Sequence, residues 1–435
     1  MKKLYQEEIK NLPTIEQKLH KFCELPKRCY LMVPFHSHSN PLPSMLYCTR
    51  THPLSELPNA LETLNVDVLY EKLKPHFINA IKNEYLLNQK IKSDNKLTEV
   101  ELNRLKGEGM IRKLSRILVC GLSSEYPHLW NVQVDTHARI DAFWNCEFHK
   151  TRYLGIATHR EDTEFEKLQK PAGMTDVTLQ FAEHAAMVLR SELPLPEFID
   201  IDDDLCTKQE IPAVKYHPKS YGYHWEKRYP TLVPAVWSGD PNKFSLMNFY
   251  TRENLLRCKE NLCAEDVRDC IISAGILASY STLLAFTTLQ GFTPFNDVTY
   301  PFTTQTVITD GQFWSFFAYQ MNTVSPAETN PLRNVCWHTE EMKLFDEVTD
   351  NNVVGLNDEV LKILLKCFCQ VPLTKDSLKM NLTPYIGKDN MSIKERQDLF
   401  YFWERKYSNR PEYREEVPLW KHIYRDFQER MPKKK

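Results

Sequence analysis

The chain has 435 residues, of which 42 % are hydrophobic and 26 % are charged. These fractions are typical of a globular protein and exclude a disordered, collagenous or coiled-coil chain. A single hydrophobic core rarely grows beyond about 250–300 residues, so we expect at least two folding units. The 12 cysteines have no regular spacing and are too few for a disulfide scaffold, which indicates reduced thiols in a reducing compartment.

The formal net charge of −2 hides an uneven distribution along the chain. Residues 1–120 carry an excess of six positive charges and residues 391–435 an excess of four, whereas residues 121–390 carry an excess of twelve negative charges. Such asymmetry favours a protein whose ends contact a polyanion and whose body contacts other proteins. The alternative is ordinary drift of charge along a long chain.

The first 120 residues are predicted to form a helical N-terminal region that contains a proline-rich segment. The prolines of 34–58 predict an extended or irregular stretch. Helical periodicity follows over 59–92, with a break or kink at Pro75. A capping box at Thr98 opens a further helix, which we expect to end at one of the two glycines of 107–109.

Residues 121–371 are predicted to form a mixed body. Alternation of apolar and polar residues over 140–146 predicts a strand. Apolar residues spaced by four, four and three predict an amphipathic helix over 176–191. Residues 192–243 are rich in proline, tyrosine and aspartate and indicate a long structured loop or a domain boundary.

The longest helical pattern covers residues 264–290, and the twenty residues from Cys270 to Leu289 carry no charge. That length is sufficient for a membrane span. Hydroxyl side chains gather in the second half, however, and no aromatic belt or basic flank follows. We therefore favour a helix buried in the protein core, with a membrane anchor as the alternative.

A β-hairpin is predicted at about 304–321, packed on long helices. Asp310 and Gly311 lie between β-branched and aromatic runs and suit the positive φ values of a type I′ turn. A final core helix is expected from Asp358 to about Cys369, capped by Asn357.

The fold class expected from these patterns is α+β. It comprises a helical N-terminal region over 1–120, the mixed body over 121–371 and a helical basic tail over 372–435. The tail is predicted from a capping box that begins at Ser392 and from apolar residues at helical spacing after it.

Motifs of the common catalytic sites are absent from the sequence. It has no Walker A pattern, dinucleotide fingerprint, nucleophile elbow or zincin helix. A zinc site at His137, Cys146 and His149 is weakly indicated, because adjacent strands could bring these ligands together. We assign no catalytic residue, no metal site and no cofactor.

A nuclease-like constellation is the basis of the alternative function, a nucleic-acid enzyme of degenerate nuclease-like fold. Asp135, Asp141, Glu147 and Lys150 lie near the predicted strand. Metal-dependent nucleases place such groups on two adjacent strands to hold Mg²⁺. Glu147 and Lys150 are three residues apart and would point to opposite faces of a strand, which argues against activity.

Basic residues interleaved with aromatic ones are the positive functional signal. Arginine and lysine contact phosphates, and planar aromatic rings stack on unpaired bases. The alternative is that the aromatic residues pack in the core and the cations are solvated. The candidates for RNA contact are Arg112, Lys113, Arg116, Lys150, Arg152, Lys219, Tyr223, Trp225, Lys227, Arg228, Lys421 and Arg425.

Five segments carry a resemblance to a known family. They are Asp297–Phe302, Val307–Gly311, Phe316–Thr323, Asn330–Trp337 and Gly355–Leu361. Together they resemble the mitochondrial ribosomal protein family also called programmed cell death protein 9, densely over about 244–371 and more loosely over 11–60.

The resemblance implies a non-catalytic structural component of the mitochondrial ribosome, in the large subunit. It further implies location in the mitochondrial matrix and contacts with ribosomal RNA and with other large-subunit proteins. One of these partners would be a sister protein that shares the hairpin. The family has no catalytic motif to transfer, and its resemblance ends at about residue 372.

Overall fold

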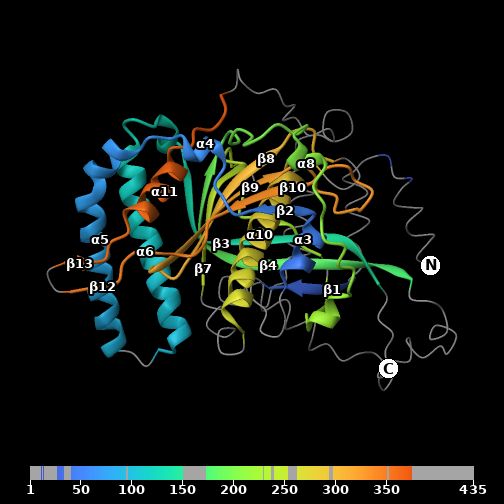
Figure 1. Ribbon diagram of the computed structural model, residues 1–435, viewed down its shortest axis with the longest axis horizontal. Coiled ribbons are helices and arrows are strands. Elements are labelled where there is room, and N and C mark those ends of the chain that lie inside the picture. Colours follow the sequence, from blue (N-terminus) through green and yellow to red (C-terminus); the bar gives the residue numbers. More distant parts are fainter. Residues whose placement is uncertain are drawn as a thin grey trace, which may run out of the picture.

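The computed structural model describes most of the chain up to residue 374. The described residues are 11, 13, 27–33, 41–94, 97–149, 173–228, 230–236, 240–252, 262–292, 297–349 and 352–374. They form one large mixed sheet of 11 strands and seven α-helices (Figure 1).

Eight strands form the main path of the sheet. Their order is β2 (Thr51–Leu54), β10 (Asn334–His338), β9 (Phe313–Met321), β8 (Phe302–Thr309), β7 (Phe244–Thr251), β4 (Met174–Ser191), β1 (Lys27–Met32) and β5 (Trp225–Arg228). Three further strands, β3 (Gln133–His149), β6 (Val233–Pro234) and β11 (Met342–Lys343), pair outside this path, and β12 (Glu347–Val348) and β13 (Val353–Val354) form a separate two-stranded sheet. Within the main path, β2 and β5 are therefore the two edge strands.

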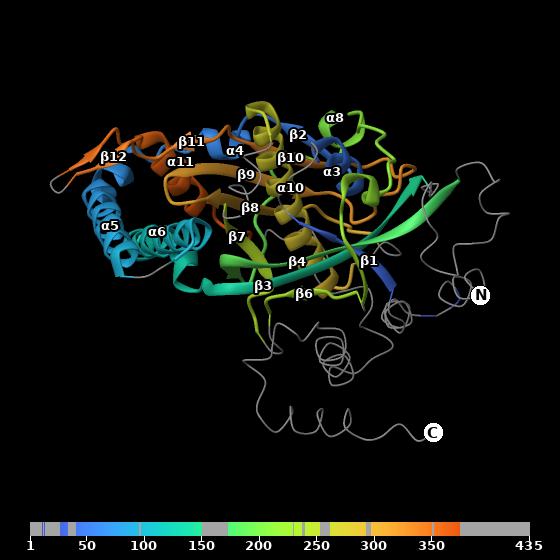
Figure 2. The same cartoon turned by 90° about the horizontal axis from the view of Figure 1, so that it is seen from below.

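Helices cover both faces of the sheet (Figures 1 and 2). They are α3 (Leu42–Thr49), α4 (Asn59–Glu62), α5 (Asp67–Asp94), α6 (Glu99–Leu122), α8 (Asp204–Thr207), α10 (Ala264–Leu289) and α11 (Asp358–Phe368). Successive residues of β9 alternate between two cores, since Phe316 packs with α5, α6 and α11 whereas Phe317 packs with α3 and α10. The molecule thus has three layers with a core on each side of the sheet.

The expected α+β arrangement is wrong, because strands from the N-terminal region belong to the same sheet as the body. Strand β1 pairs in parallel with β4, and β2 pairs in parallel with β10. The proline-rich stretch contains a helix, α3, in which Pro43 occupies the first turn. The tail predicted to be helical lies outside the described residues from 375 onward.

The helix predicted over 176–191 is instead β4, an 18-residue strand. Val177, Phe181 and Ala185 are spaced by four, and an even spacing also places residues on one face of a strand. Strand β4 pairs with β3 along its length and also contacts β1 and β7. The strand is buried among neighbours on both edges, a setting in which long-range pairing overrides the helical pattern.

Two helix ends differ from expectation. The predicted break at Pro75 is absent, because helix α5 continues through this residue, which lies on its exposed side. Helix α6 opens at the predicted Thr98 capping box but continues past its glycines to Leu122. These glycines permit close packing rather than termination, because a Cβ on Gly107 would lie 3.1 Å from the carbonyl oxygen of Thr309.

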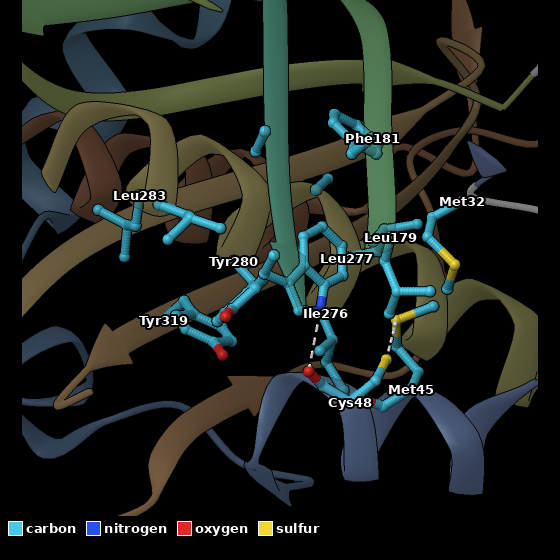
Figure 3. Packing of buried hydrophobic residues seen from close by; sticks show 14 of the residues in the cluster. Met32, Met45, Cys48, Leu179, Phe181, Ile276, Leu277, Tyr280, Leu283 and Tyr319 are labelled. Carbon is cyan, nitrogen blue, oxygen red and sulfur yellow. Dashed lines mark hydrogen bonds between the residues drawn. The ribbon is translucent and has the colours of Figure 1, made fainter. Parts of the chain in front are cut away.

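The long apolar helix is α10, and it lies in the core between α3 and the sheet (Figure 3). Its length and composition would suffice to cross a membrane, but every residue of its most apolar window is buried inside the structure. The ring of Tyr280 packs edge-on against Trp144, with centroids 5.2 Å apart. Several serine and threonine side chains of the helix bond to the preceding turn, as when Ser279 donates to the Gly275 carbonyl at 2.7 Å. This helix is therefore a core element.

The β8–β9 hairpin is present, but its turn is not type I′. Only Gly311 has a positive φ, of 95°, whereas a type I′ turn requires positive values at both central residues. Asp310 organises the loop because its Oδ1 accepts from the backbone N–H groups of Gln312 and Phe313 at 3.0 and 2.8 Å. Helix α11 begins at the predicted cap, where Asn357 accepts from the Glu359 N–H.

Candidate nucleic-acid interface

Strand β5 is an edge strand whose inner neighbour is β1. The two strands run antiparallel, with Tyr30 opposite Trp225 and Arg28 opposite Lys227. Residues directly opposite each other in an antiparallel pair lie on the same face. These four side chains therefore share one face of the sheet edge.

The segment before β5 brings another cation to this edge. The short 3₁₀ turn η3 (Pro218–Tyr221) is capped by His217, whose Nδ1 accepts from the Lys219 N–H at 3.2 Å. Gly222 ends the turn with a φ of 82°, a value that glycine adopts without a steric cost. The His217 ring then packs edge-on against Tyr30, with centroids 5.0 Å apart.

The aromatic centre of the edge is Trp225. The guanidinium carbon of Arg28 lies 4.2 Å from the centroid of its ring, which is a cation–π contact. Trp225 is 36 % exposed, and both Arg28 and Lys227 are exposed. We call Arg28, Lys219, Trp225 and Lys227 the β1–β5 edge cluster.

Burial, and after it the charge of Arg28, lowers the pKa of two ionisable groups at this edge. Partial burial and the nearby charge of Arg28 together lower the pKa of Lys219. Burial and then the same charge lower the pKa of His217, which favours its neutral form. The carboxylate of Glu226 lies in the alternate position of β5 and pairs with Arg228 at 3.7 Å. The cluster therefore concentrates positive charge around an aromatic ring.

Two of the candidates from this segment do not face solvent. Tyr223 is 5 % exposed and Arg228 is 7 % exposed. Burial raises the pKa of Tyr223. The structure thus brings Lys219, Trp225 and Lys227 together at the surface and places the other two in the interior.

The three candidates on α6 are at the other end of the molecule (Figure 1). Arg112 and Arg116 are exposed, and the Nε of Arg112 donates to the Glu108 carbonyl oxygen at 3.3 Å. Lys113 pairs with the buried carboxylate of Glu84 at 2.8 Å. Part of the positive charge of this helix is therefore neutralised within the fold. The candidates Lys150, Arg152, Lys421 and Arg425 lie outside the described residues.

Arg28 was missed by the sequence argument. The available signal was its position two residues before Tyr30, which repeats the basic–aromatic pattern seen at 219–228. Its contribution depends on the β1–β5 pairing, which joins residues about 200 positions apart.

The two aspartates of the nuclease-like constellation serve as ion-pair partners. Asp135 binds Arg190 at 2.6 Å, and Asp141 binds Arg139 and accepts from Thr231. Arg190 is fully buried and also pairs with Asp240 at 2.5 Å. Within the part of the chain that the structure describes, no group of three or more His, Cys, Asp or Glu residues is arranged to hold a metal ion, and this holds for the weak zinc candidates too.

The edge cluster has the chemistry of a single-stranded nucleic-acid contact. Lysine and arginine neutralise phosphates, and an exposed tryptophan offers a ring on which a base can stack. The Arg28 guanidinium, 4.2 Å from the centroid of that ring, adds a cation beside the stacking surface.

A comparison with protein-family models gives one match. Residues 2–372 match the family described as Mitochondrial 28S ribosomal protein S30 (PDCD9). Location in the mitochondrion, bound to the ribosome, follows from this match. The expected large-subunit assignment is contradicted, because the family description names the 28S subunit, which is the small one. Because the large-subunit assignment is wrong, the expected pairing with a large-subunit sister protein is not supported either.

Proposed function

The chain belongs to the PDCD9 family of mitochondrial ribosomal proteins, and we propose that it supports the ribosome by holding ribosomal RNA at the β1–β5 edge cluster. A non-enzymatic, structural role accords with the family description. Neighbouring ribosomal proteins would contact other parts of the same surface.

The observation that carries this proposal is the cation–π contact between Arg28 and Trp225. An exposed tryptophan beneath the Arg28 guanidinium, with Lys227 of the same strand opposite Arg28, offers a stacking surface and phosphate partners on one face. Base stacking on an aromatic ring contributes about 1–3 kcal/mol per base. The proposed ligand is an unpaired segment of ribosomal RNA, since bases in a duplex are not available for stacking.

The edge position of β5 also supports the proposal. Among the described strands of the main sheet path, β5 has only β1 as a neighbour. Its exposed lysine and tryptophan would discourage pairing with a further strand while leaving the cluster accessible. An RNA strand could therefore reach this face without displacing a strand of the sheet.

The test of RNA contact is a salt titration of binding to a short single-stranded RNA. We expect the double variant Arg28→Ala with Lys227→Ala to bind more weakly and to reduce the slope of log affinity against log salt by about 0.7 for each lost contact. The matched control changes Lys72 and Lys208 to Ala. These exposed lysines pair with Glu125 and Asp204. Substituting both removes the same total charge as the test variant does. Equal slopes in both double variants would contradict the proposed RNA contact.

The test of ribosomal function is sedimentation of the tagged protein from mitochondria in a sucrose gradient. We expect the wild-type protein to travel with ribosomal particles, and the 28S particle is the first comparison because the family description names it. The Arg28→Ala, Lys227→Ala variant should shift partly to the top of the gradient. A wild-type protein found only at the top would overturn the proposed role.

A further inference from the structure

A closed loop leads into β5. It covers residues 216–225, with the turn η3 in its middle, and we call it the η3 loop. The N–H of Tyr223 donates to the carbonyl oxygen of Pro218 at 3.3 Å and closes the loop. Pro218 and Tyr223 are both buried, so the closure is anchored in the interior. The two arms on either side of this hydrogen bond are therefore held close to each other.

Both arms of the η3 loop lie beside the same residue of β1. In the first arm, the ring of His217 packs edge-on against Tyr30 with centroids 5.0 Å apart. In the second arm, Trp225 is the cross-strand neighbour of Tyr30. Tyr216 directly precedes His217. The two ends of the loop, Tyr216 and Trp225, are therefore brought to the same part of the sheet edge.

The two ends of the loop expose aromatic rings. Tyr216 is 65 % exposed and Trp225 is 36 % exposed. Between them, Tyr223 is buried, and Tyr221 is partly buried against the core that contains α3 and α10. The fold thus uses the aromatic side chains in the middle of the loop as anchors and leaves those at its ends accessible.

The backbone on both sides of Tyr216 is fixed. The carbonyl oxygen of Lys215 accepts from the His149 N–H of β3 at 2.8 Å, and its ammonium group pairs with Glu328 at 2.7 Å. On the other side, His217 is held by its packing on β1. An exposed ring on a fixed backbone loses little conformational freedom when a ligand stacks on it, which favours binding.

We propose that Tyr216 is a second stacking surface of the RNA site, so that the η3 loop holds two unpaired bases of one strand, one on Tyr216 and one on Trp225. The inference rests on the proposed RNA contact at the β1–β5 edge cluster and extends it. Successive aromatic rings beside cations are the arrangement by which proteins bind single-stranded RNA.

The charges around the loop suit a polyanion. Lys219 is exposed in the turn between the two rings, where it would meet a phosphate of the strand that joins the two bases. The carboxylate of Glu328, which is near the Tyr216 end, is paired with Lys215. A phosphate that approaches the loop therefore meets a cation and a carboxylate that is already neutralised.

The binding test uses the full chain and fluorescein-labelled hexauridylate, followed by fluorescence anisotropy. We expect Tyr216→Ala to weaken binding about fivefold or more, the loss that one stacked base predicts. Tyr216→Phe keeps the ring and should retain most of the affinity. Trp130→Ala is the control, because it removes an exposed ring from the segment that follows α6. Equal affinities of Tyr216→Ala and Trp130→Ala, or an equal loss in Tyr216→Phe and Tyr216→Ala, would overturn the proposal.

A second probe separates base stacking from phosphate contact. An abasic hexanucleotide keeps the ribose–phosphate backbone and lacks every base. Tyr216→Ala should leave the affinity for this probe unchanged, and it should leave the salt slope for hexauridylate unchanged, because no phosphate contact is lost. A similar loss of affinity for both probes would mean that Tyr216 does not contact a base.

The double variant Tyr216→Ala, Trp225→Ala shows whether the rings hold one base or two. Two bases on separate rings predict that the fold losses of the single variants multiply. A double variant that binds as well as Trp225→Ala alone would contradict a second base.

Failure of this inference is distinguishable from failure of the proposed function. If Arg28→Ala with Lys227→Ala lowers the salt slope while Tyr216→Ala binds like Trp130→Ala, the edge cluster contacts RNA without Tyr216 and only this inference is wrong. If neither variant changes RNA binding, the proposed RNA contact is wrong and this inference fails with it. Circular dichroism of each variant gives the folded fraction to which these affinities are referred.

Discussion

Two basic regions of this protein, helix α6 and the β1–β5 edge cluster, differ in whether nearby carboxylates pair with their cations. On α6, Lys113 is bound by buried Glu84, and a second buried carboxylate, Glu108, lies between Arg104 and His137 at 3.7 Å from each. At the β1–β5 edge, Arg28 lies over Trp225 and meets no carboxylate among the described residues. Burial, and after it the charge of Arg28, lowers the pKa of Lys219. Lys113 on α6 therefore stabilises the fold, whereas Arg28 and Lys227 lie exposed at the sheet edge.

The difference teaches that local charge density is a poor guide to which cations the fold pairs with carboxylates. Both regions have several cations within a few residues, so the sequence ranks them alike. Availability depends on which opposite charges the fold places nearby, and these come from distant segments. Glu84 reaches Lys113 from a separate helix, while Trp225 reaches Arg28 from a strand that is about 200 residues away.

The largest change in stability at the α6 end of the molecule is expected from Gly311→Val. Gly311 has a φ of 95°, and a Cβ there would lie 3.1 Å from the carbonyl oxygen of Lys106 on α6. Backbone strain and overpacking together should lower the free energy of unfolding by roughly 2–4 kcal/mol. Chemical denaturation measures this change, and an unchanged midpoint would contradict the close packing. RNA affinity of the folded fraction should stay at the wild-type level, because the edge cluster is at the other end.

A smaller loss of stability is expected from Glu84→Gln. The substitution removes the carboxylate that pairs with Lys113, whose side chain is partly exposed. Breaking this half-buried pair should cost about 1–2 kcal/mol, below the figure for a fully buried one. Urea unfolding of the single variant and of Glu84→Gln with Lys113→Met tests the pairing. If the pair interacts, the double variant loses less stability than the two single changes added together.

Trp225→Ala should weaken RNA binding without a change in salt dependence. Loss of one stacked base costs about 1–3 kcal/mol, or roughly fivefold or more in affinity. The slope of log affinity against log salt should stay constant because no phosphate contact is lost. Trp225→Phe, which keeps a ring, is the matched control and should retain most of the affinity. A parallel loss in both variants would indicate that stacking is not the interaction.

The smallest effect is expected from Arg112→Ala with Arg116→Ala. If α6 contributes to the fold rather than to RNA, the salt slope should fall by less than the roughly 0.7 that one phosphate contact contributes. The same titration with Arg28→Ala and Lys227→Ala gives the reference value. If the salt slope falls more in the α6 variant than in the Arg28→Ala, Lys227→Ala variant, RNA contacts α6 rather than the β1–β5 edge.

Short-range signals were read correctly from the sequence at several positions. The Thr98 capping box is present, since Thr98 accepts from the Glu101 N–H and Glu101 accepts from the Thr98 N–H. Asn357 caps α11, and the apolar run of α10 is a single buried helix. These features need only residues within one or two turns, so a single sequence contains the required information.

Strand β4 shows where the sequence was insufficient. Its spacing by four fits both a helix face and a strand face, and only pairing with β3, β1 and β7 decides between them. The alternation of Val177, Leu179 and Phe181 with polar residues was a strand signal within the same segment.

The sequence by itself determined the caps of α6 and α11, the β8–β9 hairpin and the buried α10 helix, and it indicated the PDCD9 family but the wrong ribosomal subunit. Only the tertiary structure decided that the N-terminal strands enter the main sheet, that Arg28 meets Trp225, and that Glu84 meets Lys113. The physical reason is distance along the chain. Caps and turns are set by contacts within a few residues, whereas sheet pairing and charge neutralisation depend on segments brought together only by burial of both cores.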